Sequence, residues 1–524
     1  MGGGLLAEAP AASRSRAWWL PSLTEVVFVA VLLWVLVAGQ ASVLLADGDT
    51  GWHIRVGDYI LAEGRIPAAD LFSFSRPGAE WFAWEWGSDV LFALAHRAAG
   101  LAGVALLGGV LIAATSAALF HFLIWQRVNV LVAVVAMFVA ASASTVHWLA
   151  RPHLFTCLLF VLALWLLEAD RRQPTRWVWA LAPVAAMWAN LHGGFVVLLA
   201  TLCVYSAGSL VEVWRGSPPR RWARPRRYGL LMLAAAAASL FNAYGYQLHL
   251  HVFRYLNSNF IRDQVEEFQS PRFRGESMLA FELLLIAGLL AVPRLWRRRD
   301  YAAALLVLGL AHAALGSVRH VLLYALAATP ALALLLSEAV GKMGGRWGAA
   351  LASLSADYAP QDRPAARLAP PLWAAAAILL AAALLCSGHP RWRADFPPEK
   401  FPHRALAASE EKLVRQRVLT TDQWGSYLLY RYYPQIRVFI DGRSDFYGPE
   451  IGRQYLEMLG ANHRWEQILD RHGFDVVLLP PQWPLATLLK AHPGWRLDYD
   501  DGQALLLRRV WRGAVPSANS TSIP

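Results

Sequence analysis

Cysteine is scarce in this chain, with three among 524 residues. Cys157 and Cys203 lie inside apolar runs, and Cys386 lies at the end of one. Cysteines so placed provide neither a disulfide framework nor a zinc-binding spacing. Charged residues are also few, at 16% of the chain, and no internal repeat is visible, which excludes a repeat architecture.

The charge that is present has one predominant sign, since the formal net charge is +11 and the isoelectric point lies near 9.8. The arginines occur in short clusters between apolar runs, as at 171–176, 215–227 and 294–299. Basic clusters in this arrangement mark the cytoplasmic loops of membrane proteins. We therefore interpret the basic balance as a sign of membrane topology and expect no nucleic-acid partner.

Apolar residues, in contrast, make up 56% of the chain, and the mean hydropathy is +0.36. Apolar runs of about 20 residues recur, each long enough to cross a hydrocarbon core of roughly 30 Å. The first run is longer than the apolar core of a cleavable signal peptide, so we expect it to be retained. The sequence predicts a polytopic α-helical membrane protein with about eleven transmembrane helices, at 23–45, 101–125, 129–148, 154–168, 177–189, 195–214, 228–241, 278–293, 301–317, 321–337 and 372–387.

The alternation of basic and non-basic turns predicts a cytoplasmic N-terminus and an extracytoplasmic C-terminus. The predicted domains are a cytoplasmic N-terminus (1–22), a transmembrane domain (23–387), an extracytoplasmic α/β domain (388–512) and a disordered tail (513–524). Within the transmembrane domain, 45–87 and 242–277 are long outer loops, and 338–370 is a cytoplasmic linker. The expected location is the bacterial inner (plasma) membrane, with the active site and C-terminal domain outside.

The C-terminal part differs in character from the rest. Runs of β-branched or aliphatic residues at 417–421, 437–441 and 475–480 are separated by polar segments compatible with helices. The segments 495–499 and 503–509 flank Asp500-Asp501-Gly502, which predicts a hairpin. Strands that alternate with helices indicate a small α/β domain.

The stretch 45–87, named the acidic loop below, holds seven carboxylates and four tryptophans. Asp47 and Asp49 follow the first helix directly, and if Asp49 begins a short helix that ends at Gly64, His53 falls on the same face. Such a set could bind a divalent cation, magnesium or manganese, or a carboxylate could accept a proton from an attacking hydroxyl. Asp49 could instead only cap the helix, which could lie in the membrane interface with the tryptophans at headgroup depth.

Histidine and arginine recur at the other turns predicted for the outer face, namely at His147, Arg151, His153, His192, Arg319 and His320. Arg319 is the leading candidate for binding a lipid phosphate, because guanidinium matches phosphate oxygens bidentately, although a snorkelling arginine is equally consistent. His320 and Arg151 are further candidates for binding the same phosphate. Further candidate substrate or metal contacts are His53, His153, His192 and Glu266. Glu266 and Glu267 could together complete an acidic site, although an ordinary solvated surface is favoured for the pair.

The acidic loop carries a recognisable pattern, DGDTGWHIRVGDYILAEGRIPAADLFSFSRPG. It resembles the first outer loop of oligosaccharyltransferase catalytic subunits and related membrane glycosyltransferases of the GT-C class. That loop has an acid-x-acid pair, a His-x-Arg and then G-x-I-P-x-x-D-x-x-S. Protein O-mannosyltransferases have a similar loop, with an acid followed by His. The resemblance implies transfer of a sugar from a polyprenyl-phosphate-linked donor on the extracytoplasmic face.

By this resemblance, Asp47 and Asp49 are the pair that binds metal or activates the acceptor. Asp49 is favoured because the acid-to-His spacing of the mannosyltransferases also falls there. Where oligosaccharyltransferases have a second acid-x-acid, this chain has Arg151-Pro152-His153. A metal-independent mechanism, with a carboxylate base and basic residues on the phosphate, therefore fits at least as well as a metal site.

The C-terminal segment TTDQWGSYLLYRYYPQIRVFIDGRSDFY resembles the region in which oligosaccharyltransferases recognise an acceptor sequon. Trp424, Gly425 and Tyr427 match, but the full Trp-Trp-Asp-Tyr-Gly motif is absent, so asparagine-linked transfer is not inferred. The turn at 441–443 could be a plain strand end or part of an acceptor or sugar site.

The leading hypothesis is a GT-C-type inverting glycosyltransferase, with Asp49 and Asp47 catalytic and a protein, lipid or glycan as acceptor. The alternatives are a polysaccharide polymerase or ligase that depends on Arg319 and His320, and a transporter of lipid-linked glycans. A non-catalytic glycan-binding relative is a further alternative. Against the transporter, the charged residues cluster at one predicted face, whereas transporter sites lie near the midplane.

Overall fold

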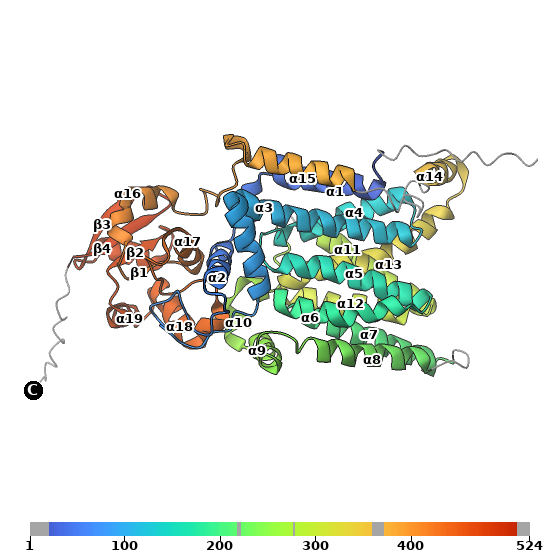
Figure 1. Cartoon of the computed structure of the whole chain (residues 1–524), viewed down its shortest axis with the longest axis horizontal. Helices are drawn as coiled ribbons and strands as arrows, with labels where there is room; N and C mark the ends of the chain where they lie inside the picture. The colour runs from blue at the N-terminus through green and yellow to red at the C-terminus, as the bar shows by residue number, and fades with distance from the viewer. Residues whose placement is uncertain (1–19, 217–221, 276–277, 359–370, 511–524) are drawn as a thin grey trace, which may run out of the picture.

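The computed structural model describes residues 20–216, 222–275, 278–358 and 371–510, which form a helical bundle beside a smaller α/β domain (Figure 1). Most of the predicted cytoplasmic N-terminus, the later part of the predicted linker and the predicted disordered tail lie outside the described residues. The helices of the bundle run side by side, and the α/β domain adjoins one end of it (Figure 1).

All eleven apolar segments predicted from the sequence are helical over most of their length. The first continues from an α-helix into a π-helix (Trp34–Ala38) and a 3-10 helix (Ala41–Leu45). The α-helices of these segments are α1 (Leu23–Leu33), α3 (Trp86–Trp125), α4 (Val130–Ser144), α5 (His153–Arg172), α6 (Leu181–Leu191), α7 (Phe195–Trp214), α8 (Ala223–Ala238), α11 (Met278–Arg297), α12 (Tyr301–Gly316), α13 (Val321–Gly341) and α15 (Leu372–Leu385).

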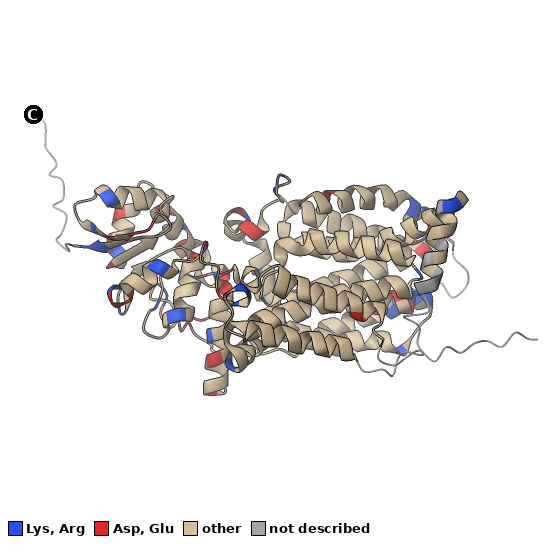
Figure 2. Ribbon diagram, turned by 90° about the horizontal axis from the view of Figure 1, so that it is seen from above, with Lys and Arg blue, Asp and Glu red and all other residues tan. Residues whose placement is uncertain are grey.

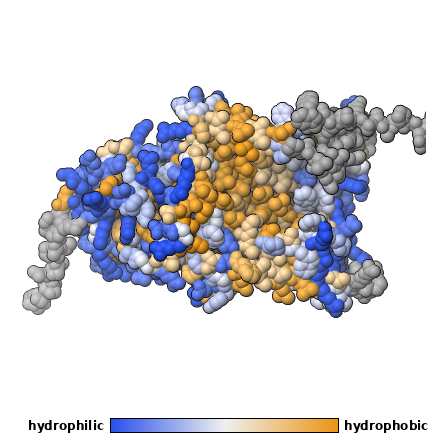
Figure 3. Space-filling view, viewed as in Figure 1, coloured by the Kyte–Doolittle hydropathy of each residue, from blue (hydrophilic) through white to orange (hydrophobic). Residues whose placement is uncertain are grey.

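Within the described ranges, six helical segments are both long and apolar enough to cross a membrane, and they include α3, α5, α7 and α11. The predicted count of eleven spans and the predicted orientation of the chain stay predictions. Large apolar side chains such as Phe138, Leu290 and Leu379 point outward from the bundle. An apolar surface lies between the hydrophilic α/β domain and the hydrophilic far end of the bundle (Figure 3). An apolar surface of this extent is expected where a bundle meets lipid.

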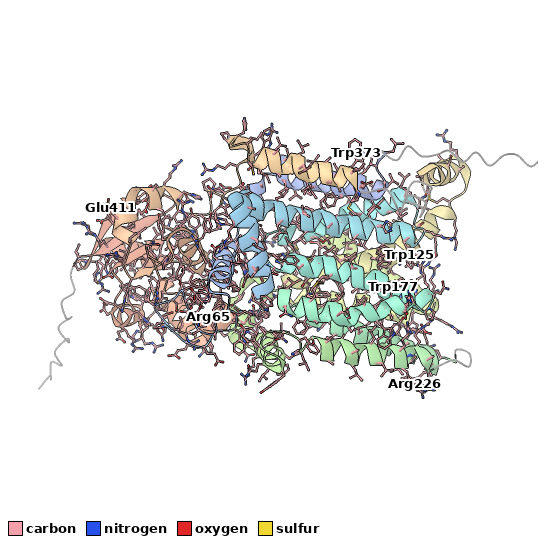
Figure 4. All side chains as sticks on the ribbon, viewed as in Figure 1. Arg65, Trp125, Trp177, Arg226, Trp373 and Glu411 are labelled. Carbon is pink, nitrogen blue, oxygen red and sulfur yellow. The ribbon has the colours of Figure 1, made fainter. Side chains whose placement is uncertain are left out.

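Charged residues concentrate at the two ends of the molecule, and few lie along the middle of the bundle (Figure 2). At the far end, Arg171 pairs with Glu168 at 2.6 Å and Arg227 pairs with Asp170 at 2.8 Å. Trp125, Trp177 and Arg226 also lie at that end, whereas Arg65 and Glu411 lie on the side of the α/β domain (Figure 4).

Helix α3 begins well before the predicted start at residue 101 and changes direction near Gly100, where φ is 59°. Glycine adopts a positive φ without steric cost, which explains why the bend falls there. The long loop predicted at 242–277 contains α9 (Tyr246–Asn257), α10 (Asn259–Gln264) and a 3-10 turn (Glu266–Phe268). The predicted linker contains α14 (Gly345–Tyr358).

The acidic loop contains helix α2 (Asp49–Glu63), which begins at Asp49 and ends before Gly64 as predicted. This helix packs between α3 and α17 (Asp422–Tyr432). A Cβ atom on Gly51 would lie 2.7 Å from the carbonyl oxygen of Ser426, so only glycine allows this approach. Trp52 and Trp81 are buried against the α/β domain, so these two tryptophans do not anchor the helix in lipid.

The α/β domain contains a four-stranded sheet of β1 (Val418–Leu419), β2 (Val476–Leu479), β3 (Trp495–Asp500) and β4 (Leu505–Arg509) in the order β1-β2-β4-β3. Strands β1 and β2 are parallel, and β3 and β4 form the predicted hairpin. The strand predicted at 437–441 is present as single bridges of Val438 with Ser73 and Val418. Besides α17, the domain's helices are α16 (His403–Leu413), α18 (Ser444–Leu459), α19 (Trp465–His472) and α20 (Pro484–Ala491).

The acidic loop and the α/β domain share hydrogen bonds and a hydrophobic core. The Phe74 amide donates to the Val438 carbonyl at 3.0 Å, and the Val438 amide donates to the Phe72 carbonyl at 3.0 Å. Phe72, Trp52 and Trp81 belong to the same buried cluster as the domain's strands. The two segments therefore form one unit, which faces the end of the bundle.

Candidate active site

A cavity opens where the acidic loop, the bundle and the α/β domain meet. Among the residues predicted from the sequence, it is lined by Asp49, His147, Arg151, His153, His192, Arg319 and His320. The turn at 442–445 of the α/β domain also lines it, together with apolar side chains of the bundle. The structure therefore brings together residues from four predicted turns that are far apart in the sequence.

Arg151 holds three carboxylates together at one wall of this cavity. Its guanidinium donates to Asp47 Oδ2 at 2.9 Å and lies 3.2 Å from Asp49 Oδ2, and it also donates to Glu267. Burial alone would lower the pKa of Arg151, but the charges of Asp47, Glu267 and Asp49 outweigh burial and raise it well above its ordinary value. The guanidinium stays charged and neutralises part of the surrounding negative charge. These four residues are named the carboxylate–arginine cluster.

Asp49 is held from both sides. Its own amide donates to Asp47 Oδ1 at 2.9 Å, and the Ser426 hydroxyl donates to Asp49 Oδ1 at 3.3 Å. A Cβ atom on Gly442 would lie 1.6 Å from that same oxygen, so the turn of the α/β domain can lie this close to Asp49 only because residue 442 is glycine. Burial, and then the neighbouring Asp47, raise the pKa of Asp49 well above its ordinary value. Asp49 is therefore a positioned carboxylate with increased affinity for a proton.

Cationic and imidazole groups face another part of the cavity. Arg319 lies over the Phe268 ring at 4.4 Å, and one of its buried nitrogens, Nη1, has no hydrogen-bond partner among the described residues. His320 Nδ1 and both ring nitrogens of His147 are likewise buried without a partner in the described part of the chain. Buried polar groups are normally hydrogen-bonded. These groups are therefore suited to an anionic ligand, such as a phosphate, that would bind them.

The remaining predicted residues have other surroundings. His153 Nε2 lies 2.6 Å from the His147 carbonyl oxygen. His53 is buried beneath the cavity wall against Asp89, and His192 lies beside Glu85. Glu266 points away from the cavity and pairs with Arg272 in an exposed ion pair at 3.6 Å. Its neighbour Glu267 occupies the cavity instead.

Sequence reasoning did not select Glu85 or Asp89 as site residues, and of the pair at 266–267 it retained Glu266 as the candidate rather than Glu267. Glu85 and Asp89 are four residues apart at the start of α3, a spacing that places both on one helix face and was an available signal. No comparable signal distinguishes Glu267 from Glu266, because neighbouring residues of a turn differ in direction only through tertiary packing.

The residues present do not fit a divalent cation. In the described part of the chain, no three His, Cys, Asp or Glu side chains are grouped so as to hold a metal ion. Asp47, Asp49 and Glu267 already have Arg151 as their shared counter-charge. His53 and His192 have carboxylate partners of their own. A cation between Asp47 and Asp49 would have to displace the guanidinium.

No known protein family matches this sequence, and no curated protein matches it either. The structure, however, is similar to that of the archaeal oligosaccharyltransferase AglB from Archaeoglobus fulgidus, which is in complex with an inhibitory peptide and a dolichol-phosphate. The alignment covers 94% of this chain and 75% of that chain, with a TM-score of 0.53 and 13% sequence identity. The predicted recognition is confirmed at the level of fold, which is that of a GT-C glycosyltransferase.

Proposed function

We propose that this protein is a membrane glycosyltransferase that transfers a sugar from a polyprenyl-phosphate-linked donor to an acceptor on the extracytoplasmic face. The supporting observation is the cavity itself. It combines a positioned carboxylate, Asp49, with nitrogen atoms of Arg319, His320 and His147 that have no hydrogen-bond partner among the residues that the structure describes. The carboxylate can accept the proton that a nucleophile must lose, and the nitrogen atoms can bind a departing phosphate.

The donor would bind on the bundle side of the cavity. Arg319 would take the phosphate oxygens, because guanidinium binds them through paired hydrogen bonds, and His320 would contribute a ring nitrogen. The apolar lining residues of that side, which would contact the polyprenyl chain, include Val196, Val197, Val252, Leu256, Leu322 and Leu323. The dolichol-phosphate bound to AglB supports a donor of this chemical class.

Asp49 would act on the acceptor. An acceptor hydroxyl or amide would form a bond to the anomeric carbon of the sugar while its proton moves to Asp49. The bond between that carbon and the phosphate oxygen would break, and its electron pair would stay on the lipid phosphate. Attack from the face opposite the phosphate inverts the anomeric centre. Because a phosphate is a good leaving group, positioning and charge stabilisation would supply most of the rate.

Arg151 would serve a different purpose from the phosphate binding predicted from the sequence. Its two terminal nitrogens are engaged by carboxylates, so we assign it to holding Asp49 in place with a fixed positive charge. In this proposal the guanidinium fills the position that a divalent cation would need, and transfer proceeds without an added metal.

The central test is Asp49→Asn. Removing the proton acceptor should lower sugar transfer by about a hundredfold or more, while insertion and thermal stability stay close to wild type. Asp58→Asn is the matched control, because Asp58 lies on the same helix but pairs with Arg97 at 3.0 Å away from the cavity. Transfer is measured as movement of labelled sugar out of the polyprenyl-phosphate pool of membranes.

Near wild-type transfer by Asp49→Asn would contradict the assignment of the base. If transfer is then lost in Arg319→Gln alone, the polymerase or ligase alternative is favoured. A wild-type protein that leaves every lipid-linked sugar pool unchanged and alters the transport of a soluble substrate would overturn the proposal.

A further inference from the structure

A second group of titratable side chains borders the cavity, next to the carboxylate–arginine cluster. It consists of Glu85 before α3, Asp89 in the first turn of α3, His53 on α2 and His192 after α6, and is named the Glu85 cluster. Glu85 lies between the two imidazoles, 3.3 Å from His192 Nε2 and 3.8 Å from His53 Nε2. Glu85 and His192 line the cavity, and the other two lie behind them.

Hydrogen bonding determines which nitrogen of His192 carries the hydrogen. The Gly194 amide donates to His192 Nδ1 at 2.9 Å, so Nδ1 must be an acceptor. The Thr156 hydroxyl, which itself receives the Trp188 indole N–H at 2.7 Å, lies 2.8 Å from the same Nδ1. The hydrogen of a neutral His192 therefore sits on Nε2, the ring nitrogen nearer Glu85.

His53 lies on the other side of Glu85. Its Nδ1 is 2.6 Å from Asp89 Oδ1, so these two atoms share one hydrogen, and the Nε2 atom of the ring faces Glu85. At 3.8 Å, the Nε2 atom of His53 is beyond hydrogen-bond distance of Glu85. Glu85 thus lies beside an imidazole nitrogen of His192 and farther from one of His53, and neither contact holds a proton on Glu85 tightly.

The surroundings favour the protonated form of Glu85. Burial raises its pKa to about 8, and it lowers the pKa of both His53 and His192 well below the ordinary histidine value. Near pH 7, Glu85 is therefore mostly a neutral acid between two neutral imidazoles. The charged and titratable groups that face the cluster from neighbouring elements are Arg151, His153, Glu267, Arg319 and Asp445.

We propose that Glu85 is a second catalytic residue of this cavity, which donates a hydrogen bond and then its proton to the departing lipid phosphate. The inference rests on the proposed function, because it requires a phosphate at Arg319. An ionised Glu85 would repel such a phosphate, whereas a neutral acid donates to it.

In this step the bond between the anomeric carbon and the phosphate oxygen breaks, and its electron pair stays on the phosphate. The Glu85 proton joins a phosphate oxygen. Glu85 becomes a carboxylate that accepts the Nε2 hydrogen of His192, and Asp49 holds the proton of the acceptor. Water entering the emptied cavity returns a proton to Glu85 and removes one from Asp49. His53, Asp89 and His192 are positioning residues in this scheme.

The test measures binding of decaprenyl phosphate alone to the full-length protein in detergent, at several pH values. Wild-type affinity should fall by about tenfold between about pH 7 and about pH 9, because Glu85 loses its proton in that interval. Glu85→Gln, which cannot ionise, should lose this dependence. Glu80→Gln is the matched control, because Glu80 is an exposed residue of the same loop and should follow the wild-type curve. The ionisation of the phosphate itself is common to all three curves.

A second measurement needs no ligand. The infrared spectrum of the wild type should contain a protonated-carboxyl band near neutral pH that Glu85→Gln removes and Glu80→Gln retains. The inference is overturned if Glu85→Gln keeps the wild-type pH dependence of binding, or if the band survives the substitution. Failure of the wild type to bind decaprenyl phosphate at any pH would instead overturn the proposed donor class, and this inference with it.

Discussion

Arg151 is the residue through which three parts of the chain act on one another. It lies between Asp47 and Asp49 of the acidic loop and Glu267 of the 3-10 turn after α10. A single carboxylate exposed near the membrane surface would need no counter-charge. Together and buried, they need a counter-charge, and here the protein supplies it from its own sequence.

Replacing Arg151 therefore has a predictable cost. Arg151→Gln should destabilise the protein by about 3–5 kcal/mol, because three carboxylates lose their shared partner, and transfer should be lost as well. Thermal unfolding in detergent measures the change. Arg272→Gln is the control, since its exposed pair with Glu266 should contribute no more than about 1 kcal/mol.

The role assigned to Arg151 also predicts the effect of metal removal on sugar transfer. Wild-type transfer should stay within about twofold after treatment with EDTA, because Arg151 supplies the positive charge that a cation would otherwise provide. A loss of about tenfold or more that manganese restores would contradict this assignment of Arg151.

At the scale of elements, α2 decides whether the site can assemble. It is pressed against α17 through Gly51 and against α3 through Gly57, where a Cβ atom would lie 2.0 Å from the Asp89 carbonyl oxygen. These contacts set the distance between Asp49 on α2 and Ser426 on α17. The helix therefore acts as a spacer between the bundle and the α/β domain.

Enlarging the spacer should separate its neighbours. In Gly51→Ala, the added Cβ would meet the Ser426 carbonyl oxygen and the Tyr430 Cβ at 2.7 and 2.8 Å. We expect a stability loss of about 1–3 kcal/mol, weaker transfer and faster proteolysis between bundle and domain. Gly309→Ala on α12 should change none of these, because no heavy atom lies within 4 Å of its Cβ position in the described residues. Equal behaviour of the two variants would show that α2 does not set this spacing.

Local signals explain why the bounds of α2 and the β3–β4 hairpin could be predicted. Asp49 and Gly64 mark the ends of the helix, and Gly502, with a φ of 81°, lies at the hairpin turn. The burial of α2 could not be predicted in the same way. An amphipathic helix pattern is the same whether its apolar side meets lipid or a protein domain, and the domain that covers α2 lies at the other end of the sequence.

At the scale of the whole molecule, the orientation of the chain in the membrane determines the side on which the cavity opens. The arginine-rich end of the bundle lies opposite the α/β domain (Figure 2). The positive-inside rule predicts that this end faces the cytoplasm and that the cavity opens on the other side of the membrane. Alkaline phosphatase fused after residue 510 should therefore be active, and a fusion after Arg215, in the basic turn after α7, should not. The reverse pattern would contradict the predicted topology.

The co-location of the polar turns could be predicted from topology, because all were expected on one face. Their pairing could not. That Arg151 meets carboxylates rather than phosphate, and that Glu85 lies between two histidines, depends on contacts between residues far apart in the chain. The low identity to AglB shows that this fold persists while most of its side chains differ.

The bonding of the acidic loop to the α/β domain has a consequence for biosynthesis. The Ser75 hydroxyl donates to the Phe439 carbonyl, a partner 364 residues later in the chain. A ribosome therefore delivers the acidic loop long before the segment that pairs with it, and the loop must wait beside the membrane with Phe72 and Trp81 uncovered. Chains that terminate early would insert a nearly full bundle yet expose this aromatic surface, which makes them natural targets for chaperones and quality-control proteases.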